Sequence, residues 1–323
     1  MRILLTGATG VIGRRVIPLL VADGHSVAGV GRTAAKREQL ERQGARGFEL
    51  DLFDPKAVSR AVAGTEVICN LATAVPRGAR VLLPSSWREM SRIRREASAN
   101  LVRAALESRT VRYLIQESFA PIYADAGDHW IDETFPVRPA RYNRSVLAAE
   151  ASTARFAERG GQGVVLRFGW FYGPDDSVTR TLLESVRRGR FPLLGRPEGY
   201  SSWLAHDDAA TAVVAALKVP SGIYNVVEDN PLRRRELAQG IAALLHVGPP
   251  RFLPSWMTSL SGSVGQTLAR SLRISNRKFK QASGWTPSYP TALSGLSAIL
   301  RNGVRPASER NPVHAGRAAR ARR

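Results

Sequence analysis

A glycine-rich turn near the N-terminus restricts the folds open to this chain more than any other feature. The turn follows a short apolar run at residues 2–6, precedes a stretch of helical periodicity, and reads Thr6-Gly7-Ala8-Thr9-Gly10-Val11-Ile12-Gly13. In such a unit the first glycine permits the tight turn, the second lets a pyrophosphate approach the backbone, and the third allows helix and strand to pack closely. The helix N-terminus adds unpaired amides and a positive dipole end. We therefore predict a dinucleotide site, with a turn retained without ligand as the alternative; the expected contacts are Thr6, Gly7, Thr9, Gly10, Val11, Ile12 and Gly13.

Apolar runs of strand length alternate with helical stretches along the N-terminal part of the chain. Strands are expected at 2–6, 26–30, 47–50, 66–71, 111–116 and 163–167. Helices are expected at 11–23, 36–43, 55–63, 87–108 and 145–159. This alternation predicts parallel βαβ units and an α/β fold, a Rossmann-like doubly wound parallel sheet followed by a smaller C-terminal α/β substrate lobe.

The sequence changes character after residue 173. Gly173-Pro174-Asp175-Asp176 interrupts the alternation, and short helical pieces then alternate with turns rich in proline and glycine. A length of 323 residues fits about two lobes. The expected organisation is a dinucleotide-binding domain at 1–173, a substrate lobe at 174–300, a segment at 204–228 that returns to the sheet, and pocket-covering residues at 251–257 and 259–265.

The formal net charge of +20 raises the question of a nucleic-acid partner. Of the 47 basic residues, five are lysine and 42 are arginine, and the arginines are scattered through every segment rather than gathered on one element. The densest stretch, 301–323, holds seven arginines and one glutamate among Gly, Pro and Ala, which predicts a disordered basic tail. We expect a solvated basic surface, a small-molecule substrate and a monomer or homodimer. Binding of nucleic acid or of an acidic partner is the alternative.

Cysteine content and hydropathy bear on the compartment. Cys69 lies in an apolar run that predicts a buried strand, and a single cysteine can form neither an intrachain disulfide nor a cysteine-based metal site. The N-terminal apolar run is too short for a signal peptide, and no stretch reaches the ~20 apolar residues of a membrane span. These features predict a cytoplasmic protein without a membrane partner.

The residues after the second strand indicate which dinucleotide is bound. A free ribose 2′-hydroxyl is usually held by a carboxylate at this position, whereas a 2′-phosphate requires cations. Here Arg32 and Thr33 follow the strand, Lys36 comes next, and the first carboxylate is Glu38. The planar guanidinium of Arg32 can stack on adenine and pair with the phosphate. NADP(H) is therefore favoured and NAD(H) is possible; alternatively, Arg32 is one of many surface arginines.

Further cofactor contacts are expected where later strands end. Asp51 and Leu52 follow the third strand, where the carboxylate could accept from the adenine amino group. Asp54, followed by Pro55, is more simply a helix cap. The remaining expected contacts are the small-residue segment Leu71, Ala72 and Thr73 after the fourth strand, and Phe168, Gly169 and Trp170 after the sixth, with Trp170 flanking the nicotinamide.

The sequence resembles the extended short-chain dehydrogenase/reductase family, also called the NAD-dependent epimerase/dehydratase family, over about residues 1–300. The matching segments are Thr6–Gly13, Asp51–Asp54, Asn70–Ala74, Leu166–Pro174, Trp203–Ala210 and Gly222–Val226. The resemblance implies a nicotinamide cofactor and the oxidation or reduction of a carbonyl/alcohol pair. This reaction can also be one step of an epimerase or dehydratase cycle. It further implies a tyrosine acid/base with a lysine four residues on, a serine or threonine, and a helix asparagine.

This chain departs from the family at three of those four positions. Tyr142 matches the tyrosine, but Val146 replaces the lysine that would stabilise a phenolate. Phe119 falls on the serine position with Ser118 beside it, and Arg94 falls on the asparagine position. In one hypothesis Tyr142 donates a proton during hydride transfer and Ser118 holds the carbonyl oxygen. The charge of the missing lysine would then come from Arg94 or Arg95. In the other, the protein binds NADP(H) without turnover, as a regulatory or structural protein.

Two histidine-containing segments are weighed as metal or catalytic sites. His129 lies near Asp132 and Glu133 in the loop before Tyr142, where an acidic pair is more simply structural. His206-Asp207-Asp208 is more simply the cap of a helix that begins near residue 209. We therefore expect no metal site.

Overall fold

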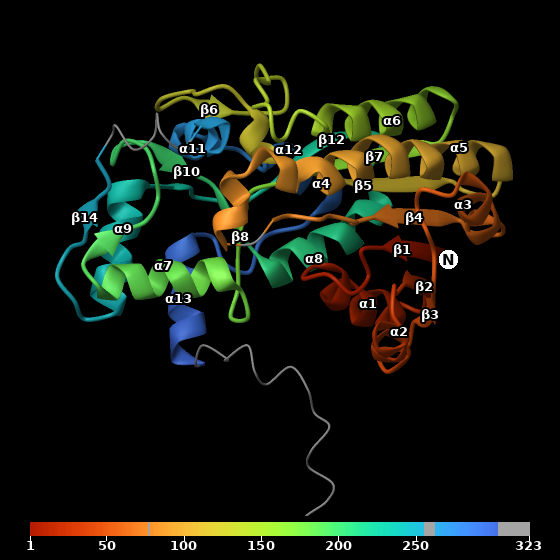
Figure 1. The fold of residues 1–323 in the computed structure, drawn as a ribbon, viewed down its shortest axis with the longest axis horizontal. Helices are drawn as coiled ribbons and strands as arrows, with labels where there is room; N and C mark the ends of the chain where they lie inside the picture. Colours follow the sequence, from red (N-terminus) through yellow and green to blue (C-terminus); the bar gives the residue numbers. More distant parts are fainter. Residues whose placement is uncertain (77, 255–261, 303–323) are drawn as a thin grey trace, which may run out of the picture.

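The fold is a seven-stranded parallel sheet covered by helices on both faces (Figure 1). It was obtained as a computed structural model that describes residues 1–76, 78–254 and 262–302. The strand order is β12-β7-β5-β4-β1-β2-β3, so the chain reverses direction across the sheet between β1 and β4. The strands are β1 (Arg2–Thr6), β2 (Ser26–Val30), β3 (Arg46–Phe48), β4 (Val67–Asn70), β5 (Tyr113–Phe119), β7 (Gln162–Phe168) and β12 (Gly222–Val226). The predicted doubly wound α/β fold is thereby confirmed, and the reversal places a ligand-binding edge at the carboxyl ends of β1 and β4.

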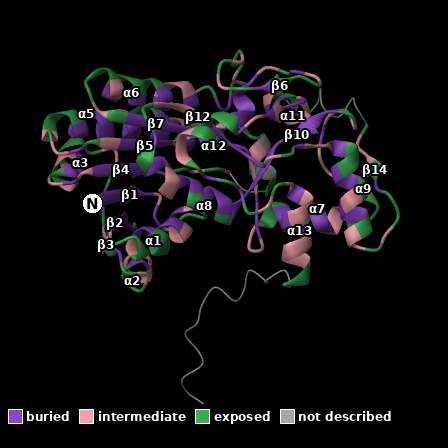
Figure 2. Ribbon diagram, turned by 180° about the vertical axis from the view of Figure 1, so that it is seen from behind, coloured by how far each residue is buried: buried purple, intermediate pink, exposed green. Residues whose placement is uncertain are grey.

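Two apolar layers hold the helices to the sheet, whose strands are largely buried in Figure 2. On one face, Ile17 and Leu20 of α1 pack with α8 and with residues of the sheet such as Leu5. On the other, Leu101 and Phe156 pack from α5 and α6, together with α3. The helices are α1 (Gly13–Ala22), α2 (Ala34–Glu41), α3 (Pro55–Val62), α5 (Ser98–Ser108), α6 (Val146–Glu158) and α8 (His206–Ala215). Burial on both faces explains why the strands read as continuous apolar runs.

Two details differ from the expected boundaries and affect the site. The fifth strand was expected to end at residue 116, but β5 continues to Phe119, so Ser118 and Phe119 are sheet residues. The helix expected over 87–108 consists of α4 (Arg88–Arg92), a π-helical turn η3 (Ile93–Ala97) and α5. Sequence periodicity cannot show a π turn, because it adds a single residue within an otherwise regular helix.

The chain beyond residue 174 forms helices and strands of two or three residues around a separate apolar cluster. Leu183, Phe191, Leu237 and Leu296 are among its buried members. The helices here are α7 (Ser177–Arg187), α9 (Arg234–Leu244), α11 (Gly262–Ala269), α12 (Arg277–Ser283) and α13 (Ala292–Arg301). The short strands are β8 (Trp170–Tyr172), β9 (Arg190–Phe191), β10 (Tyr200–Ser201), β11 (Trp203–Ala205), β13 (Leu232–Arg233), β14 (Arg251–Phe252) and β15 (Arg273–Ile274), and β6 (Trp130–Ile131) pairs with β15. As expected, a later strand returns to the main sheet: β12 pairs in parallel with β7.

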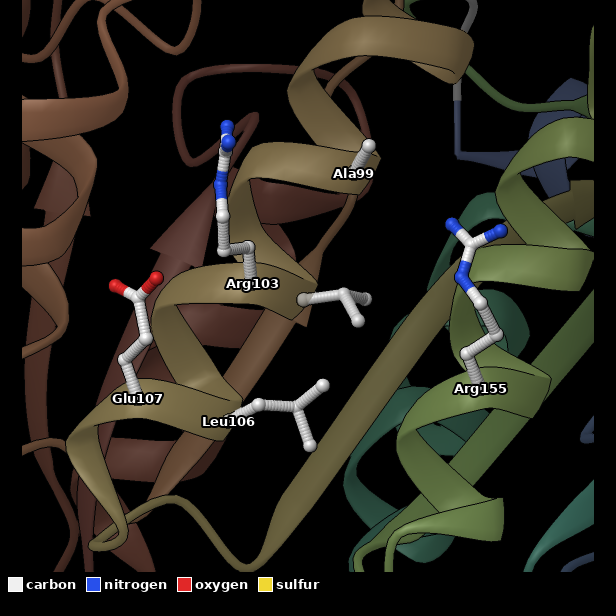
Figure 3. A pocket seen from close by; sticks show the side chains of 6 residues that line it. Ala99, Arg103, Leu106, Glu107 and Arg155 are labelled. Atoms are coloured by element: carbon white, nitrogen blue, oxygen red, sulfur yellow. The ribbon is translucent and has the colours of Figure 1, made fainter.

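An outer groove of about 370 Å³ runs between α5 and α6. Figure 3 shows Arg103 and Glu107 projecting from one helix and Arg155 from the other. Its lining includes none of the residues expected to contact cofactor or substrate.

Within the described ranges, no helix combines the length and apolar character needed to cross a bilayer. Cys69 is fully buried, and burial raises the pKa of its thiol to about 12.

Candidate active site

The turn after β1 has the geometry of a phosphate cradle. Gly7 has a φ of +65°, and a Cβ at this position would collide with the carbonyl group of Leu71. A Cβ on Gly13 would collide with the carbonyl oxygen of Gly7, so the helix starts in direct contact with the turn. The amide of Gly10 donates to the Gly7 oxygen at 2.9 Å, and Gly10 itself is exposed. A side chain at Gly7 or Gly13 would require the turn to open, which explains the glycines and leaves exposed backbone at the start of α1.

A buried polar network fixes the strand ends beneath this turn. Thr6 Oγ1 donates to Asn70 Oδ1 at 2.6 Å, and Asn70 Nδ2 donates to Gln116 Oε1 at 2.8 Å and to Ser98 Oγ at 3.2 Å. The network therefore connects β1, β4, β5 and α5 at the edge where a cofactor would lie. Leu71 and Ala72 are nearly buried and Thr73 is exposed, so only the last of these expected contacts presents a free side chain. Neither Gln116 nor Ser98 was predicted, although a polar residue ending an apolar strand is a usable signal.

The residues expected around an adenosine lie at the ends of β2 and β3. The Arg32 side chain is 74% exposed, and its Nη1 lies 3.5 Å from Glu89 Oε1 of α4. Thr33 caps α2 by accepting from the Lys36 amide. Asp51 is exposed, with Oδ1 accepting from the Phe53 amide at 2.9 Å. Arg32 is thus a largely free cation at the predicted phosphate position.

The structure confirms that Asp54 caps a helix. Its Oδ1 accepts from the Lys56 amide at 2.9 Å and caps α3, with Pro55 in the first turn. Leu52 is half-buried, and its carbonyl oxygen accepts from Asn100 Nδ2 at 3.0 Å. This segment is therefore held against α5 through its backbone.

Aromatic side chains occupy the edge at the ends of β5 and β7. The half-buried rings of Phe119 and Trp170 meet edge to face, with centroids 5.1 Å apart. Phe168 is buried in the main core, and the Gly169 amide donates to Val226 at 3.1 Å. Phe119 stands at the position where the family resemblance implied a serine. The site therefore has an aromatic wall, formed by Phe119 and Trp170, where a serine hydroxyl was implied.

Ser118 lies one residue earlier and points into a buried network. Its Oγ donates to Glu150 Oε1 of α6 at 2.5 Å, and it is 1% exposed. Glu150 also accepts from Nε and Nη2 of Arg167 at 2.9 and 2.7 Å. Nη1 of Arg167 donates to the Tyr123 hydroxyl at 2.8 Å, and that hydroxyl donates to Asn225 Oδ1 at 2.8 Å. The Ser118 hydroxyl is therefore engaged by a buried carboxylate that sequence reasoning did not identify.

Tyr142 lies in the turn before α6 and is almost buried. Its ring packs against that of Trp87 at a tilt of 56°, with centroids 4.5 Å apart. Burial raises the pKa of the phenol, and this effect outweighs a hydrogen bond with the Thr267 side chain and the nearby charges of Arg94 and Arg270. Val146 is fully buried at the position where the resemblance implied a lysine. The Tyr142 hydroxyl is therefore protonated at neutral pH.

Two of the predicted catalytic residues, Tyr142 and Arg94, are brought into electrostatic contact. Arg94 lies in the π turn with its side chain 4% exposed, and its Nη2 is 2.9 Å from Glu117 Oε1. Arg95, the other expected cation, is exposed and donates to the Ser91 carbonyl oxygen of its own helix. Arg270, which sequence reasoning missed, lies near the phenol from a distant segment. The charges of two arginines, Arg94 and Arg270, therefore act on Tyr142.

Several buried polar atoms around Tyr142 have no hydrogen-bond partner within the described residues. They are Arg94 Nε, Glu117 Oε2, both amide atoms of Asn143, and Ser145 Oγ. Buried polar groups are normally satisfied, so such a concentration is typical of a place where ligand or water binds. These atoms belong to the elements that hold the two predicted catalytic residues.

The histidine segments form no metal centre in the part of the chain that the structure describes. His206 Nδ1 lies 3.7 Å from Asp175 Oδ1, and burial lowers the pKa of the imidazole to about 4. The helix here begins at His206 rather than near residue 209, so His206 and the two aspartates form its first turn. Glu133 accepts from the Asn225 amide at 2.7 Å, which fits a structural role. The pocket-covering residues expected at 255–261 and the tail from 303 onward lie outside the described residues.

Comparisons with known proteins find one matching family and several similar chains. The model of the "NAD dependent epimerase/dehydratase family" matches residues 3–226. The chain is 32% identical to the 3-diazoavenalumate denitrifying reductase of a Streptomyces species, over 92% of this chain and 99% of that protein. It is structurally similar to human epimerase family protein SDR39U1 with NADPH, with a TM-score of 0.76, 22% identity, and coverage of 94% of this chain and 100% of that one. It is also similar to MoeE5 in complex with UDP-glucose and NAD, with a TM-score of 0.74, 22% identity, and coverage of 94% and 99%.

Proposed function

Because the chain belongs to the NAD-dependent epimerase/dehydratase family, whose model covers residues 3–226, we propose that it is an NADP(H)-dependent reductase of a carbonyl or related unsaturated group. The observation that carries this proposal is the protonated Tyr142 hydroxyl, which lies within the electrostatic influence of Arg94 and Arg270. The similarity to a reductase over nearly the full length of both chains supports the same reaction class.

The residues at the strand ends fit a dinucleotide. The turn from Gly7 to Gly13 would receive the pyrophosphate, because Gly10 and Val11 at its tip are exposed and the glycines at its ends let the helix start in contact with the turn. Arg32 would face the adenosine ribose, and the aromatic wall of Phe119 and Trp170 would face the nicotinamide end. When bound, a reduced nicotinamide supplies hydride to the substrate.

Tyr142 is proposed as the proton donor that completes the reduction. Burial keeps its hydroxyl protonated, and the guanidinium groups of Arg94 and Arg270 would stabilise the phenolate that remains after the proton leaves. With these two arginines near the phenolate, the lysine that Val146 replaces is not needed to stabilise it. Because Ser118 donates to Glu150, the substrate oxygen would be held mainly by Tyr142 itself.

NADP(H) is the proposed cofactor in preference to NAD(H). Arg32 is exposed with only a long contact to Glu89, and Lys36 lies one helical turn away, so a 2′-phosphate would meet two cations. Titration of NADPH and NADH should show tighter NADPH binding, and Arg32→Gln should remove most of the difference. The control is Arg42→Gln on the exposed side of α2, which should leave both affinities unchanged. Equal affinities in the unmodified protein would overturn the preference.

The reaction is tested by screening carbonyl and nucleotide-sugar compounds for oxidation of NADPH. Once turnover is found, Tyr142→Phe should reduce kcat by about 100-fold or more, as expected for loss of a positioned proton donor, while NADPH affinity is retained. Tyr113→Phe, which removes a half-buried hydroxyl at the start of β5, is the matched control. Unchanged kcat in Tyr142→Phe would remove this residue from the mechanism.

Cofactor binding without turnover is the second candidate. It is favoured by Val146 in place of the lysine and by the engagement of Ser118 with Glu150. Tight NADPH binding with no oxidation across the full screen would support this candidate. In either case, we propose that residues 1–173 bind the cofactor and that the lobe at 174–300 supplies the substrate contacts.

A further inference from the structure

Arg270 and Arg138 converge on one short stretch of backbone beside Tyr142. Nη1 of Arg270 donates to the Tyr123 carbonyl oxygen at 2.9 Å, and the backbone amide of Arg138 donates to the preceding carbonyl, that of Ile122, at 2.7 Å. Tyr123 also forms an antiparallel bridge with Val137. The side chain of Arg270 and the backbone of Arg138 therefore contact adjacent residues, and the charge of Arg138 acts on Arg270.

Neither arginine lies within ion-pair distance of a carboxylate in the described chain. No ion pair is formed by Arg270 or Arg138 there, whereas Arg94 is paired with Glu117 at 2.9 Å. Asp125 is the nearby acidic group, but its Oδ2 accepts from the Ser271 amide at 2.9 Å and its Oδ1 from the Gly127 amide at 3.0 Å. Burial and the charge of Arg138 lower the pKa of Arg270, and the nearby charge of Asp125 offsets only part of this effect. A half-buried cation beside a second cation is unfavourable unless an anion joins them.

A buried arginine side chain, that of Arg234, holds the backbone at Arg270 in place. Arg234, which is 2% exposed, donates through Nη2 to the Arg270 carbonyl oxygen at 2.6 Å and to that of Leu268 at 2.8 Å. Thr267, whose side chain hydrogen-bonds with Tyr142, lies three residues before Arg270 in the same segment. The hydrogen bonds from Arg234 thus fix the segment that carries both Arg270 and Thr267.

The surface next to this arginine pair is apolar and aromatic. Trp87, Met90, Tyr142 and Val264 form a buried cluster, with Leu268 packed against it. A ligand that reaches Arg270 past Tyr142 would therefore contact rings and aliphatic groups along its body. This favours an organic anion with an apolar body over a compact inorganic ion.

We propose that Arg270 and Arg138 form a carboxylate-binding subsite that positions an apolar, carboxylate-bearing substrate beside Tyr142. The guanidinium of Arg270 can bind a carboxylate through charge-assisted hydrogen bonds, and Arg138 adds charge from the exposed side. That the bound carboxylate is a substrate rests on the proposed reduction. The subsite itself is defined by carboxylate binding alone. It also gives a reason for two cations near the phenol: Arg94 has its own carboxylate, and Arg270 takes that of the substrate.

The test measures binding of cinnamate and of its neutral amide, cinnamamide, to the full chain saturated with NADP⁺, using calorimetry or the fluorescence of its tryptophans. Cinnamate should bind at least about tenfold more tightly than cinnamamide, the difference expected for one charge-assisted contact. Arg270→Gln should weaken cinnamate binding by about tenfold and leave cinnamamide binding unchanged. Arg138→Gln should have a smaller effect of the same sign. Arg188→Gln, an exposed change at the end of α7, should have none.

Three results would overturn the subsite. They are equal binding of cinnamate and cinnamamide, unchanged cinnamate binding in Arg270→Gln, and an Arg270-dependent affinity for UDP without any for cinnamate, which would indicate a diphosphate site instead. The affinity of Arg270→Gln for NADPH verifies that the variant is folded. If cinnamate binding depends on Arg270 but no compound is reduced, the proposed reaction fails and the subsite stands. If a neutral carbonyl compound is reduced and cinnamate does not bind, the reaction stands and the subsite fails.

Discussion

Glu150→Gln perturbs the buried network behind the aromatic wall while conserving the volume of the side chain. Glu150 is 7% exposed and receives three hydrogen bonds, two from Arg167 and one from Ser118. Arg167 is 4% exposed, and the Glu150 carboxylate outweighs the effect of burial and raises the pKa of its guanidinium. No other carboxylate pairs with Arg167 within the described residues. The amide therefore leaves a buried cation without its anion.

The expected loss in the free energy of unfolding is about 3–5 kcal/mol, the range found when one partner of a buried ion pair is removed. An amide oxygen can keep only part of the three hydrogen bonds, and its NH₂ group would face the donors of Arg167. The Tyr123 hydroxyl would remain bonded to Arg167 but cannot supply negative charge, because burial raises the pKa of the phenol to about 12. Removing both charges, with Arg167→Met added, should recover much of the loss, because burying a charge is itself costly.

Urea unfolding followed by circular dichroism gives the midpoint and slope for the unmodified protein, both single variants and the double variant. The coupling energy from this cycle isolates the interaction of Glu150 with Arg167. Glu158→Gln, at the exposed end of the same helix, is the control for loss of a carboxylate and should leave the midpoint unchanged. A loss below about 1 kcal/mol in Glu150→Gln would refute the reasoning, since that is the size of an exposed ion pair.

Three further predictions follow from burial and backbone geometry. Burial raises the pKa of Tyr142, so its hydroxyl stays protonated to a higher pH than a free phenol; the reduction rate at saturating NADPH should be flat between about pH 6 and 9, while the reverse oxidation should rise with pH. A fall in reduction through the neutral range would contradict this role. Glu228 is buried and accepts from two backbone amides, so Glu228→Gln should leave one of them unpaired and lower the free energy of unfolding by about 1–3 kcal/mol in urea titrations. Gly7→Ala should weaken NADPH binding by more than about tenfold, because it combines positive φ with a collision. Gly24→Ala, with similar φ and no neighbour within 4 Å, should leave that affinity unchanged.

The sheet and the cofactor turn could be predicted because their signals are local. Gly7, Gly10 and Gly13 follow a strand and open a helix, and the apolar runs have the length of buried strands, so the order of elements is fixed by residues close in sequence. The cap at Asp54 was predictable for the same reason. Strand ends were less certain: β5 continues to Phe119 because its last residues remain paired with β7, which is a tertiary effect.

The surroundings of Tyr142 were only partly predictable. Arg94 could be proposed because the facing helix is near in sequence and its position could be counted. Arg270 and Thr267 could not, because they approach from a segment more than a hundred residues later whose path no local pattern specifies. The engagement of Ser118 by Glu150 was hidden for a related reason, since a glutamate in a helix is ordinarily exposed and only the assembled fold buries it against Arg167.

The π turn at Ile93–Ala97 has a consequence for the history of this site. A π turn differs from an α-helix by one inserted residue, and here it contains Arg94, whose side chain reaches Glu117 on β5. Deleting one residue from this turn would restore a regular helix and leave the flanking turns in register, whereas the side chains within the turn itself would point in new directions. Arg94 would then leave the buried pair, although every residue type of the site was still present. A relative lacking that one residue would thus differ at the phenol more than its overall identity suggests, and an alignment of the two should place its gap within the turn.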